Sequence, residues 1–503
     1  MSIHPLLPLP ATLTQPLWLP AAIRQHEGAA TEAAGLTLSA LMAEAGAAVL
    51  AAARHYFPAA RCYLLLCGGG NNGGDGYVAA RLALLAGLEV RLVAAVDPAR
   101  LTGDAAAAHA AFVAAGGECL PWQPALLEGV DLIIDALLGS GGQGALRPEL
   151  VAICRAINAK KCPLLAVDLP TGLDGSSGMA DADSLRASLT LTFLAAKPGL
   201  FTGRGPSCSG QVVLAPLLAP GLLAQQQAAF GGLLPAHAQA LPPRSLVGHK
   251  GLYGKLLLVG GGSGMAGAAR LCGEAALRGG VGLVAVACGA GSAAAISGPC
   301  PELMADERPE LLAARLAWAS LVVVGPGLGR DAWAASCWQQ VVATDLPLLV
   351  DGDALWWLAQ APQRRENWVL TPHPGEAATL LGWPLATVEA DRPAAARALQ
   401  QRYGGVVVLK GAGTLVVDGQ QLWLSPWSLA ALASAGMGDL LAGIIAAGLA
   451  QGLAAVDAAC RCVILHADAA SRAAAGDERG LLARDLLPWV RKLSNEQCQL
   501  SAQ

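Results

Sequence analysis

The chain has 503 residues, with 33 Lys and Arg against 37 Asp and Glu and a formal net charge of -4. Hydrophobic residues make up 54% and charged residues only 14%, which excludes an intrinsically disordered protein. The slight acidity argues against nucleic acid as a partner, and the length allows roughly two to four domains.

The mean hydropathy of +0.48 raises the question of a membrane protein. A spanning helix needs ~20 apolar residues, and the best uncharged stretch, Leu440 to Val456, is shorter. It lies between Asp439 and Asp457, and we predict a buried core helix there. Residues 1–16 lack the basic and apolar segments of a signal peptide. The 13 cysteines form no CxxC pair, so we expect reduced thiols in a cytoplasmic protein with no membrane partner.

The first half of the chain alternates apolar strands with Ala-rich helices. The predicted strands are Cys62–Leu66, Glu89–Ala94, Leu132–Ile134 and Leu164–Val167, and the predicted helices include Leu38–Ala53, Gly76–Ala86 and Glu149–Ala159. This alternation is typical of βαβ units and predicts a parallel sheet covered by helices on both faces. Ligands of such sheets bind at the carboxyl ends of the strands.

A glycine-rich segment, Gly68 to Gly76, follows the first of these strands and precedes a predicted helix. Its glycines let the backbone approach a ligand, and the helix N-terminus offers N–H groups to a phosphate. Asn71 and Asn72 supply amide groups, and Asp75 either caps the helix or holds a ribose hydroxyl. The alternative is a glycine-rich turn without a ligand. The spacing matches neither the Rossmann GxGxxG fingerprint nor a P-loop.

Two further strands end at an aspartate that precedes a flexible loop, namely Asp135 and Asp168. Either aspartate alone is explained equally well as a helix cap. Together with the Asn-Gly loop, the two predict a shared cleft. Its carboxylate and amide oxygens suit a hard cation.

In this order, the motifs GNNGGDG, DALLGSG, VDLPTG and KPGL resemble the NAD(P)H-hydrate epimerase domain, over about residues 20 to 215. The resemblance implies a Rossmann-like domain that interconverts the R and S forms of hydrated NADH and NADPH (NADHX and NADPHX) at nicotinamide C6. It implies that Asp168 handles the proton and that Asn72, Asp135 and Thr171 bind K⁺. The implied substrate contacts are Asn71, Asn72, Gly73, Gly74, Asp75, Gly139, Ser140, Gly141, Gly142, Gln143, Gly144, Ala145 and Asp168.

No charged residue lies between Arg204 and Arg244, and prolines punctuate this stretch. We therefore predict a linker over 221–245, between a domain over 1–220 and a second over 246–503. The second half repeats the α/β pattern, with predicted strands at Lys255–Val259, Leu283–Ala287, Leu321–Val324, Leu348–Val350 and Val406–Leu409.

Glycine clusters again follow strands in the second half. Those at 260–264 and 325–329 are equally well explained as turns or as sites. A stronger signal is Lys410–Thr414 at a strand end, together with Ala435–Asp439 before the apolar helix. Glycines at a helix N-terminus leave N–H donors for an anion. Asp439 is then either a helix cap or a catalytic group next to the bound phosphate.

The motifs HKGLYG, GPGLG, DGDAL, TPHPGE, KGAGT and GMGD together resemble the ADP-dependent NAD(P)H-hydrate dehydratase, which has the ribokinase-like fold, over about residues 240 to 490. The resemblance implies ADP with Mg²⁺ as cofactor, AMP as a related ligand and Asp439 as a catalytic group. The implied hydrate contacts are Ala268, Gly327, His373 and Asp439, and the implied nucleotide contacts are Lys410, Gly411, Ala412, Gly413, Thr414 and Gly438. The two halves in series resemble the bifunctional NAD(P)H-hydrate repair family.

Ala435 stands where that family has glycine, and Leu429 stands where it has asparagine. A methyl group at 435 requires a negative φ where glycine would be free. Two other functions stay open: a ribokinase-like small-molecule kinase with Asp439 as base, and an N-terminal module that senses a nucleotide without catalysis. A homo-oligomer is also left open.

Overall fold

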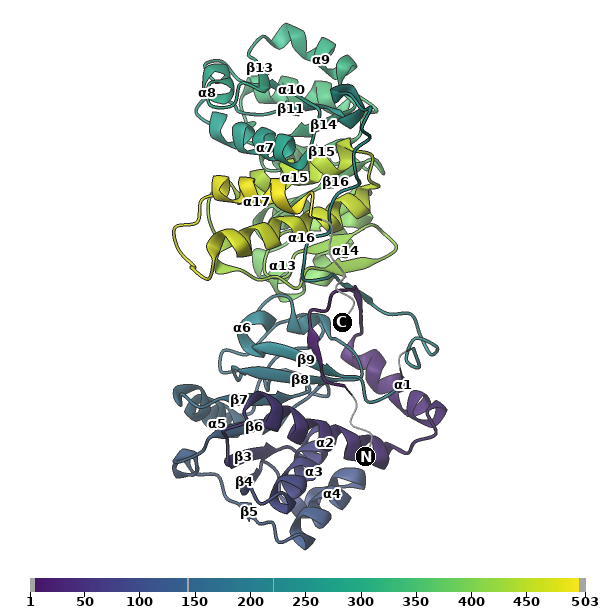
Figure 1. Cartoon of the computed structure of the whole chain (residues 1–503), viewed down its shortest axis with the longest axis vertical. Helices are drawn as coiled ribbons and strands as arrows, with labels where there is room; N and C mark the ends of the chain where they lie inside the picture. The colour runs from purple at the N-terminus through teal and green to yellow at the C-terminus, as the bar shows by residue number, and fades with distance from the viewer. Residues whose placement is uncertain (1–4, 143, 220, 497–503) are drawn as a thin grey trace. The chain divides into compact units, whose positions relative to one another are not determined.

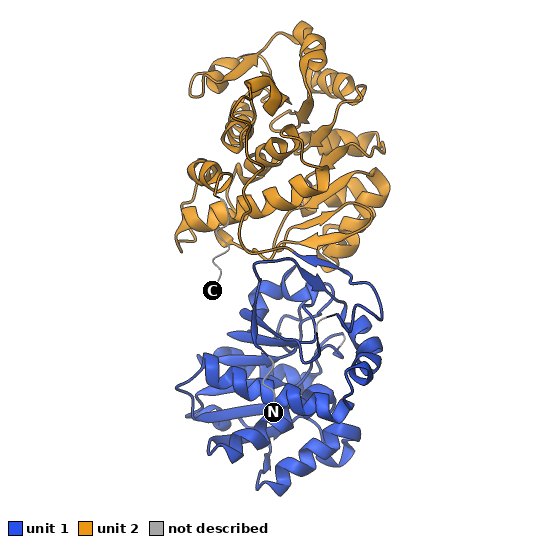
Figure 2. Cartoon of the chain, turned by 45° about the vertical axis from the view of Figure 1, so that its right-hand side comes forward, with its two compact units in different colours: residues 1–233 blue, residues 234–503 orange. Residues whose placement is uncertain are grey.

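The structure is a computed structural model that describes residues 5–142, 144–219 and 221–496 (Figure 1). The chain forms two compact units, residues 1–233 and 234–503 (Figure 2). Their division falls inside the expected linker, and the short strand β10 (Gly231–Leu233) in that stretch pairs with β2 (Gln15–Leu17) of the first unit. The domain bounds given above stay a prediction.

The main sheet of the first unit is parallel apart from one edge strand. Its strands lie in the order β1 (Leu7–Leu9), β9 (Gln211–Ala215), β8 (Leu189–Phe193), β7 (Leu164–Val167), β6 (Leu132–Ala136), β3 (Cys62–Cys67), β4 (Glu89–Ala94) and β5 (Cys119–Leu120). Only β1 runs antiparallel to its neighbour. The chain order reverses between β3 and β6, and such a switch point opens a crevice at the carboxyl ends of the strands.

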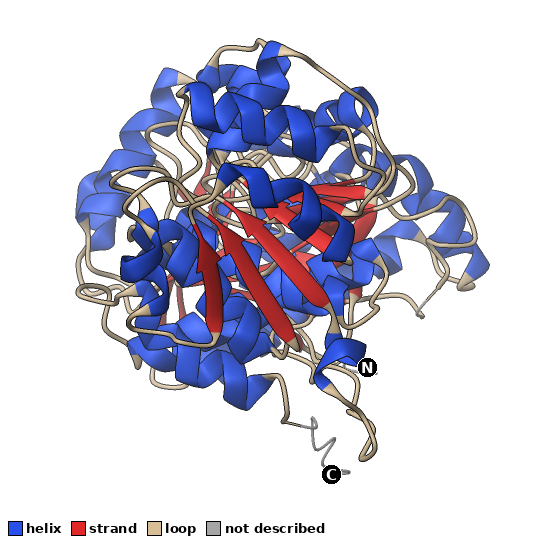
Figure 3. Cartoon of the chain, turned by 90° about the horizontal axis from the view of Figure 1, so that it is seen from above, coloured by secondary structure: helices blue, strands red, loops and turns tan. Residues whose placement is uncertain are grey.

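Helices cover both faces of this sheet, because side chains along a strand alternate between the faces. Leu64 and Leu66 pack with α5 on one face, and Leu65 packs with α2 and α3 on the other. Figure 3 shows strands (red) flanked by helices (blue). The helices of this unit are α1 (Pro20–Ala33), α2 (Leu38–Tyr56), α3 (Asn71–Leu85), α4 (Gly103–Ala114), α5 (Pro148–Ala159) and α6 (Gly205–Ser209).

Helix α3 begins at Asn71, so the prediction of a loop up to Gly76 was wrong. The glycines serve close packing here, since no glycine from 68 to 76 has a positive φ. A Cβ on Gly73 would lie 2.0 Å from the carbonyl oxygen of Gly68, and one on Gly76 would lie 2.7 Å from Cys67 Sγ. The missing side chains let the first turns of α3 lie directly against the end of β3.

The second unit repeats this plan. Its strands lie in the order β13 (Leu303–Asp306), β12 (Leu283–Ala287), β11 (Lys255–Val259), β14 (Leu321–Val324), β15 (Leu348–Val350), β16 (Trp368–Leu370), β17 (Val406–Leu409), β18 (Leu415–Val417) and β19 (Leu422–Leu424). The strands from β13 to β17 are parallel, and β18 and β19 extend the sheet in antiparallel fashion. The switch point lies between β11 and β14.

Helices α7 and α15 pack closely on one face of this sheet. A Cβ on Gly443 of α15 would lie 2.1 Å from the carbonyl oxygen of Cys272 in α7, so only glycine permits this contact. The helices are α7 (Ala266–Gly279), α8 (Ala293–Ser297), α9 (Leu312–Trp318), α10 (Ala332–Val342), α11 (Asp353–Gln360), α12 (Pro374–Leu381), α13 (Leu385–Ala390), α14 (Arg392–Tyr403), α15 (Met437–Ala450), α16 (Ala455–Ala474) and α17 (Leu487–Leu493).

The apolar stretch from 440 to 456 is buried as predicted only from 440 to 448, and it is not one helix. Helix α15 ends at Ala450, and Gly452 (φ 88°) turns the chain before α16 begins. Within the described residues no single helix is long and apolar enough to cross a membrane; α1 and α2, which meet at 105°, reach that length and composition only as a pair.

The contact at Gly73 yields a first prediction. Gly73→Ala forces α3 away from β3 and should destabilise the first unit by about 1–3 kcal/mol, the usual cost of overpacking. Gly70→Ala is the matched control, because a Cβ there meets nothing within 4 Å. Urea unfolding of the full chain measures both, and equal midpoints for the two variants would contradict the packing role.

Candidate functional site

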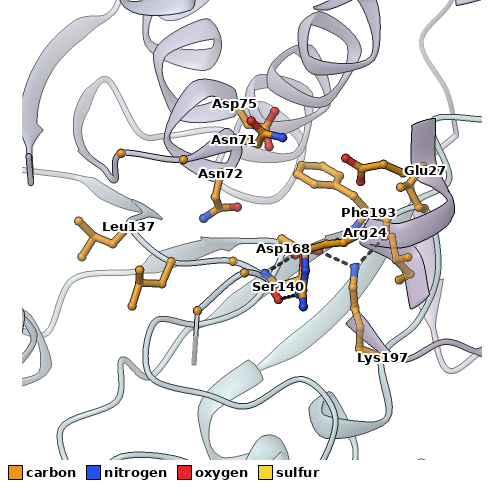
Figure 4. Close-up of a pocket in the computed structure, with 18 residues that line it drawn as sticks. Arg24, Glu27, Asn71, Asn72, Asp75, Leu137, Ser140, Asp168, Phe193 and Lys197 are labelled. Carbon is orange, nitrogen blue, oxygen red and sulfur yellow. Dashed lines mark hydrogen bonds and ion pairs between the residues drawn. The ribbon is translucent and has the colours of Figure 1, made fainter. Parts of the chain in front are cut away.

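A cavity of about 370 Å³ lies at the carboxyl ends of β3 and β6, at the switch point of the first unit. Helix α1, the start of α3, the loop after β6 and the segments after β7 and β8 form its walls (Figure 4). Its polar lining residues are Arg24, Glu27, Asn71, Asn72, Asp75, Ser140, Asp168 and Lys197.

A buried ion pair dominates this cavity. Lys197 Nζ lies 2.5 Å from Asp168 Oδ1, and the exposed fractions of the two side chains are 1% and 7%. Lys197 also donates to Thr192 Oγ1 (2.9 Å) and to the carbonyl oxygen of Phe193 (2.8 Å). The ammonium group thus has a partner for each of its three hydrogens.

Asp168 is held in an uncommon backbone conformation with a φ of 66°. A non-glycine residue in this region carries strain, and such strain clusters at functional sites. The backbone N–H of Ser140 donates to the other carboxylate oxygen, Oδ2, at 2.9 Å. Burial raises the pKa of Asp168, but the charge of Lys197 and the hydrogen bonds from Lys197 and Ser140 outweigh it, so the net pKa lies below the ordinary range.

Asp75 and Glu27 have the opposite electrostatics. Burial, followed by the charges of Asp168 and Glu27, raises the pKa of Asp75 well above its ordinary value. Burial and the charge of Asp168 also raise the pKa of Glu27, against the nearby charges of Lys197 and Arg24. The cavity therefore holds one carboxyl group whose pKa is lowered and two whose pKa values are raised, Asp75 the more strongly.

One short segment, Leu137 to Gly139, contacts the three residues predicted to bind a cation. Thr171 donates to Asp135 through its N–H (2.8 Å) and its hydroxyl (2.7 Å). The N–H of Leu137 donates to Asp135 and that of Leu138 to Thr171 Oγ1, both at 3.2 Å. A Cβ on Gly139 would lie 2.7 Å from Asn72 Oδ1 and 3.2 Å from Asp168 Oδ2. Burial raises the pKa of Asp135 to about 6, although these hydrogen bonds oppose the rise.

A second cavity of about 380 Å³ shares Leu138, Gly139 and Gly142 with the first. Gly144 and Ala145 line this second cavity. The predicted contacts on the loop after β6 are thus spread between two adjoining cavities, whereas Asn71, Asn72, Asp75 and Asp168 line the first cavity. Gly73 and Gly74 are not among the lining residues of either cavity, and Gln143 lies outside the described residues.

Sequence reasoning assigned no role to Lys197, Arg24 or Glu27. Lys197 was quoted only as part of a motif. It is the one charged residue in the apolar stretch from 194 to 201, and a lysine in such a stretch indicates a buried cation that needs an acidic partner. No motif marks Arg24, which reaches from α1 to the carbonyl oxygen of Ser140.

The second unit has a similar charged cluster at the ends of β15, β16 and β17. Lys410 Nζ lies 2.8 Å from Asp351 Oδ1 and 3.8 Å from Glu376 Oε2. Thr371 donates its hydroxyl to Asp351 at 2.7 Å. Asp351 and Glu376 were quoted in motifs without a role, and the structure places both against the predicted nucleotide contact Lys410.

His373 caps helix α12, since its Nδ1 accepts from the N–H groups of Gly375 (3.0 Å) and Glu376 (3.3 Å). Nδ1 is thus an acceptor, which leaves Nε2 as the protonated nitrogen of the neutral ring. Burial, then the charge of Lys410, lowers the pKa of His373. Burial raises the pKa of Glu376 to about 7, although Lys410 opposes the shift. The cluster therefore combines a neutral histidine with a carboxyl group that titrates near neutral pH.

Asp439 lies in the first turn of α15, next to the other predicted contacts. Burial and the charge of Asp351 raise its pKa to about 6, and Lys410 opposes this rise. A Cβ on the adjacent Gly438 would lie 3.3 Å from Lys410 Nζ. A carboxyl group with this pKa suits general acid or base catalysis near neutral pH.

Ala435 has the negative φ that its methyl group requires. Gly436 takes the left-handed conformation (φ 84°). Ala268 and Gly327 meet at the switch point, where a Cβ on Gly327 would lie 3.1 Å from that of Ala268. Buried Arg392, which sequence reasoning missed, supports the loop after β17 by donating to the carbonyl oxygens of Lys410 (3.2 Å) and Gly413 (3.3 Å).

Two family models match the chain. The model described as NAD(P)H-hydrate dehydratase matches residues 256–491, and the model described as YjeF-related protein N-terminus matches residues 38–199. A bifunctional NAD(P)H-hydrate repair enzyme of Escherichia coli (strain K12) is 42% identical over 98% of this chain and 97% of its own. The enzyme of Leishmania major with the same description is 35% identical over 95% of this chain and 93% of its own.

A crystal structure of an ADP/ATP-dependent NAD(P)H-hydrate dehydratase from Bacillus subtilis, co-crystallized with ATP/Mg²⁺, is 28% identical and covers 50% of this chain and 93% of that chain, with a TM-score of 0.46. From the two family models and the near full-length relatives, the chain is an α/β enzyme with a Rossmann-like first unit and a ribokinase-like second unit. It belongs to the family of bifunctional NAD(P)H-hydrate repair enzymes, which confirms the resemblance drawn from its motifs.

The buried pair in the first unit yields a second prediction. Lys197→Met leaves Asp168 buried without its counter-charge and should cost about 3–5 kcal/mol at neutral pH. In the wild-type protein the pKa of Asp168 is lower in the folded than in the unfolded state. The pair therefore contributes its full stabilisation at pH values above the unfolded pKa, and this stabilisation is lost as the pH falls through the folded pKa. In the variant burial is opposed only by the remaining hydrogen bonds, such as that from Ser140, and should raise the folded pKa, so the deficit should shrink as pH falls.

Urea midpoints at pH 7.5 and pH 5 measure this difference. Lys160→Met is the control, because its pair with Glu128 is exposed and contributes about 0–1 kcal/mol. A Lys197→Met deficit that is the same at both pH values would show that the lysine does not neutralise Asp168.

Proposed function

We propose that this protein repairs hydrated NADH and NADPH. The first unit interconverts the R and S hydrates, and the second unit removes water from the S hydrate in an ADP-dependent reaction. The observation that carries this proposal is that each unit places a Lys–Asp pair and an acid of raised pKa at the carboxyl ends of its parallel strands, in a chain of this family. The same fold class also contains small-molecule kinases, but membership over nearly the whole chain favours the repair reaction.

In the first unit, Asp168 is the group that we propose to handle the proton that moves during inversion at C6. Lys197 keeps its carboxylate ionised and fixes its position. Residues 71–75 and 139–145 would hold the substrate, with the nucleotide extending along the loop between the two cavities. At about 370 Å³ and 380 Å³, both cavities are in the usual size range of small-molecule sites.

We also propose that K⁺ binds beside this cavity through Asn72, Asp135 and Thr171. All three present oxygen atoms, the ligands of hard cations, and one backbone segment touches all three. The buried Nδ2 of Asn72 has no hydrogen-bond partner in the described part of the chain, and a half-turn of the amide would bring Oδ1 to the same place. A bound cation would supply positive charge that favours the ionised form of Asp135 and would order the loop that carries Ser140.

In the second unit, hydroxide is a poor leaving group, so C6–O cleavage needs a proton donor or conversion of the hydroxyl to a phosphate ester. We propose that Asp439 acts on this hydroxyl and that Ala268, Gly327 and His373 contact the hydrate. The raised pKa of Asp439 fits a group that exchanges protons near pH 6. The neutral His373 carries its proton on Nε2, which lies 3.5 Å from Glu376 Oε1, and we propose that this N–H turns to the substrate when the hydrate binds.

We propose that the nucleotide binds along Lys410–Thr414 and Gly438. Lys410 supplies a positive charge, and the N-terminus of α15 supplies N–H groups and the positive end of the helix dipole. ADP would carry Mg²⁺ close to the carboxyl groups of Glu376 and Asp439, both of which have raised pKa values. The positive charge of the ion would favour the ionised forms of these two groups, and their negative charges would balance it. The free thiols of the described cysteines fit a reducing compartment, and we expect the cytoplasm.

Two substitutions should separate the activities. Asp168→Asn should lower epimerisation by about 10²–10⁴-fold and leave dehydration of the pure S hydrate unchanged. Asp439→Asn should do the reverse, because each carboxyl group serves one unit. Chromatography of the R:S ratio and recovery of reduced-nicotinamide absorbance with ADP measure the two reactions. Loss of both activities in either variant, or of neither, would refute the assignment.

The cation site predicts that epimerisation depends on K⁺. Replacing K⁺ with Li⁺ at constant ionic strength should slow the first unit, and Thr171→Val should abolish this dependence because it removes one oxygen ligand. Thr190→Val is the matched control, since Thr190 is equally buried but bonds the carbonyl oxygen of Ser209 instead. A rate that is insensitive to K⁺ in the wild type would exclude the site.

A further inference from the structure

Inverting the configuration at C6 requires one group that delivers a proton and one that removes it, and only Asp168 has been given a role so far. The ionisable side chains that line the first cavity are Arg24, Glu27, Asp75, Asp168 and Lys197. An arginine does not release its proton in a protein. The donor is therefore Lys197, Glu27 or Asp75.

Lys197 does not fit this role. Its three hydrogens are directed to Asp168, Thr192 and the carbonyl oxygen of Phe193, all within 2.9 Å. Transfer of one of them would leave Asp168 as a buried charge without a partner, which is strongly unfavourable. Lys197 is a positioning residue for Asp168.

Asp75 fits the role best. The residue is 8% exposed, lines the cavity, and forms no hydrogen bond or ion pair within the part of the chain that the structure describes. A buried carboxyl group without a partner is costly as an anion and favours the neutral form. Figure 4 shows Asp75 entering the cavity from α3, and Asp168 with Lys197 entering from the other side. Glu27 is more exposed, and both Lys197 and Arg24 favour its charged form.

We propose that Asp75 is the proton donor of the first unit, that it acts on one face of the substrate ring while Asp168 acts on the other, and that the C6 oxygen is exchanged with water in each inversion. This inference rests on the proposed epimerase function. Two carboxyl groups on opposite faces, one neutral and one ionised, are also the arrangement by which inverting glycosidases replace an oxygen substituent with water.

The step balances as follows. Asp75 gives its proton to the C6 oxygen, the C6–O bond breaks, water leaves, and the lone pair of N1 forms an N1=C6 double bond. A second water attacks C6 from the opposite face, its proton passes to Asp168, and the double-bond electrons return to N1. Asp75 ends ionised and Asp168 protonated, and exchange with cavity water restores both. The reverse inversion follows the same path with the two roles exchanged.

The surroundings of Asp75 support this order of protonation. The groups that act on its pKa are Asp168 and Glu27, both acidic, and burial acts in the same direction. Cys67 on β3 also faces Asp75 and is neutral, because burial raises its own pKa. The helices packed against α3 carry Glu44, Arg54 and His55 on α2 and Asp104 and His109 on α4. Epimerisation should therefore persist until pH rises through the raised pKa of Asp75 and should then fall.

The test follows epimerisation by the full chain in H₂¹⁸O, without ADP, over a range of pH. The wild type should place one ¹⁸O at C6 for each inversion above the spontaneous rate, and its rate should fall on the alkaline side. Asp75→Asn should lose about 10²–10⁴-fold in rate, together with the alkaline limb, while still binding the hydrate. Asp75→Glu should recover part of the rate, and Glu27→Gln, the matched control, should keep the alkaline limb.

Inversion that keeps the original C6 oxygen would overturn the water-exchange step. An Asp75→Asn variant that keeps the wild-type rate would overturn the role of Asp75. If Asp75→Asn is unstable, Asp75→Glu decides the question, because a donor with a longer side chain changes rate and pH profile whereas a structural residue changes only stability. A wild-type protein that epimerises no hydrate at all would instead refute the proposed function.

Discussion

A lysine paired with a buried aspartate at the carboxyl end of a parallel strand organises each of the two units. In the first unit Lys197 holds Asp168, and in the second Lys410 holds Asp351. Each lysine also keeps its partner aspartate ionised, because a carboxylate that is shielded from water and has no counter-charge would be neutralised by a rise of its pKa. In the first unit the result is one carboxyl group of lowered pKa, Asp168, beside two of raised pKa, Asp75 and Glu27. In the second, the carboxyl groups of Glu376 and Asp439 titrate close to neutral pH.

These pairs lie where they do because the strands are parallel. All carboxyl ends of a parallel sheet meet at one edge, and the reversal of strand order leaves a crevice there. Glycine brings the neighbouring helices close enough to complete the walls: Gly73 sets α3 against β3, and Gly443 sets α15 against α7. The same plan in both units gives two sites that suit one nucleotide substrate and differ in which acid faces it. An epimerase beside a dehydratase is useful because the first supplies the epimer that the second consumes.

Much of this architecture was predictable from sequence. Strands such as Leu164–Val167 and Leu321–Val324 were predicted with their observed bounds, since continuous apolar runs between helical segments have few other interpretations. The start of α3 was missed because its glycines were interpreted as a turn, whereas they serve packing between segments distant in sequence. The ion pair between Lys197 and Asp168 was also missed, since nothing in the local sequence of either residue names its partner. For the same reason the left-handed backbone of Asp168 and the missing partner of Asp75 became visible only in the structure.

The central claim is that both units act on the same damaged coenzyme, one on the configuration of its C6 oxygen and the other on the bond to it. The most direct measurement is the final yield when the full chain is given a known mixture of R and S hydrates with excess ADP. We expect reduced-nicotinamide absorbance to recover to the level of the whole mixture, at a rate above spontaneous epimerisation. Recovery that stops at the S share, or no recovery at all, would contradict the account.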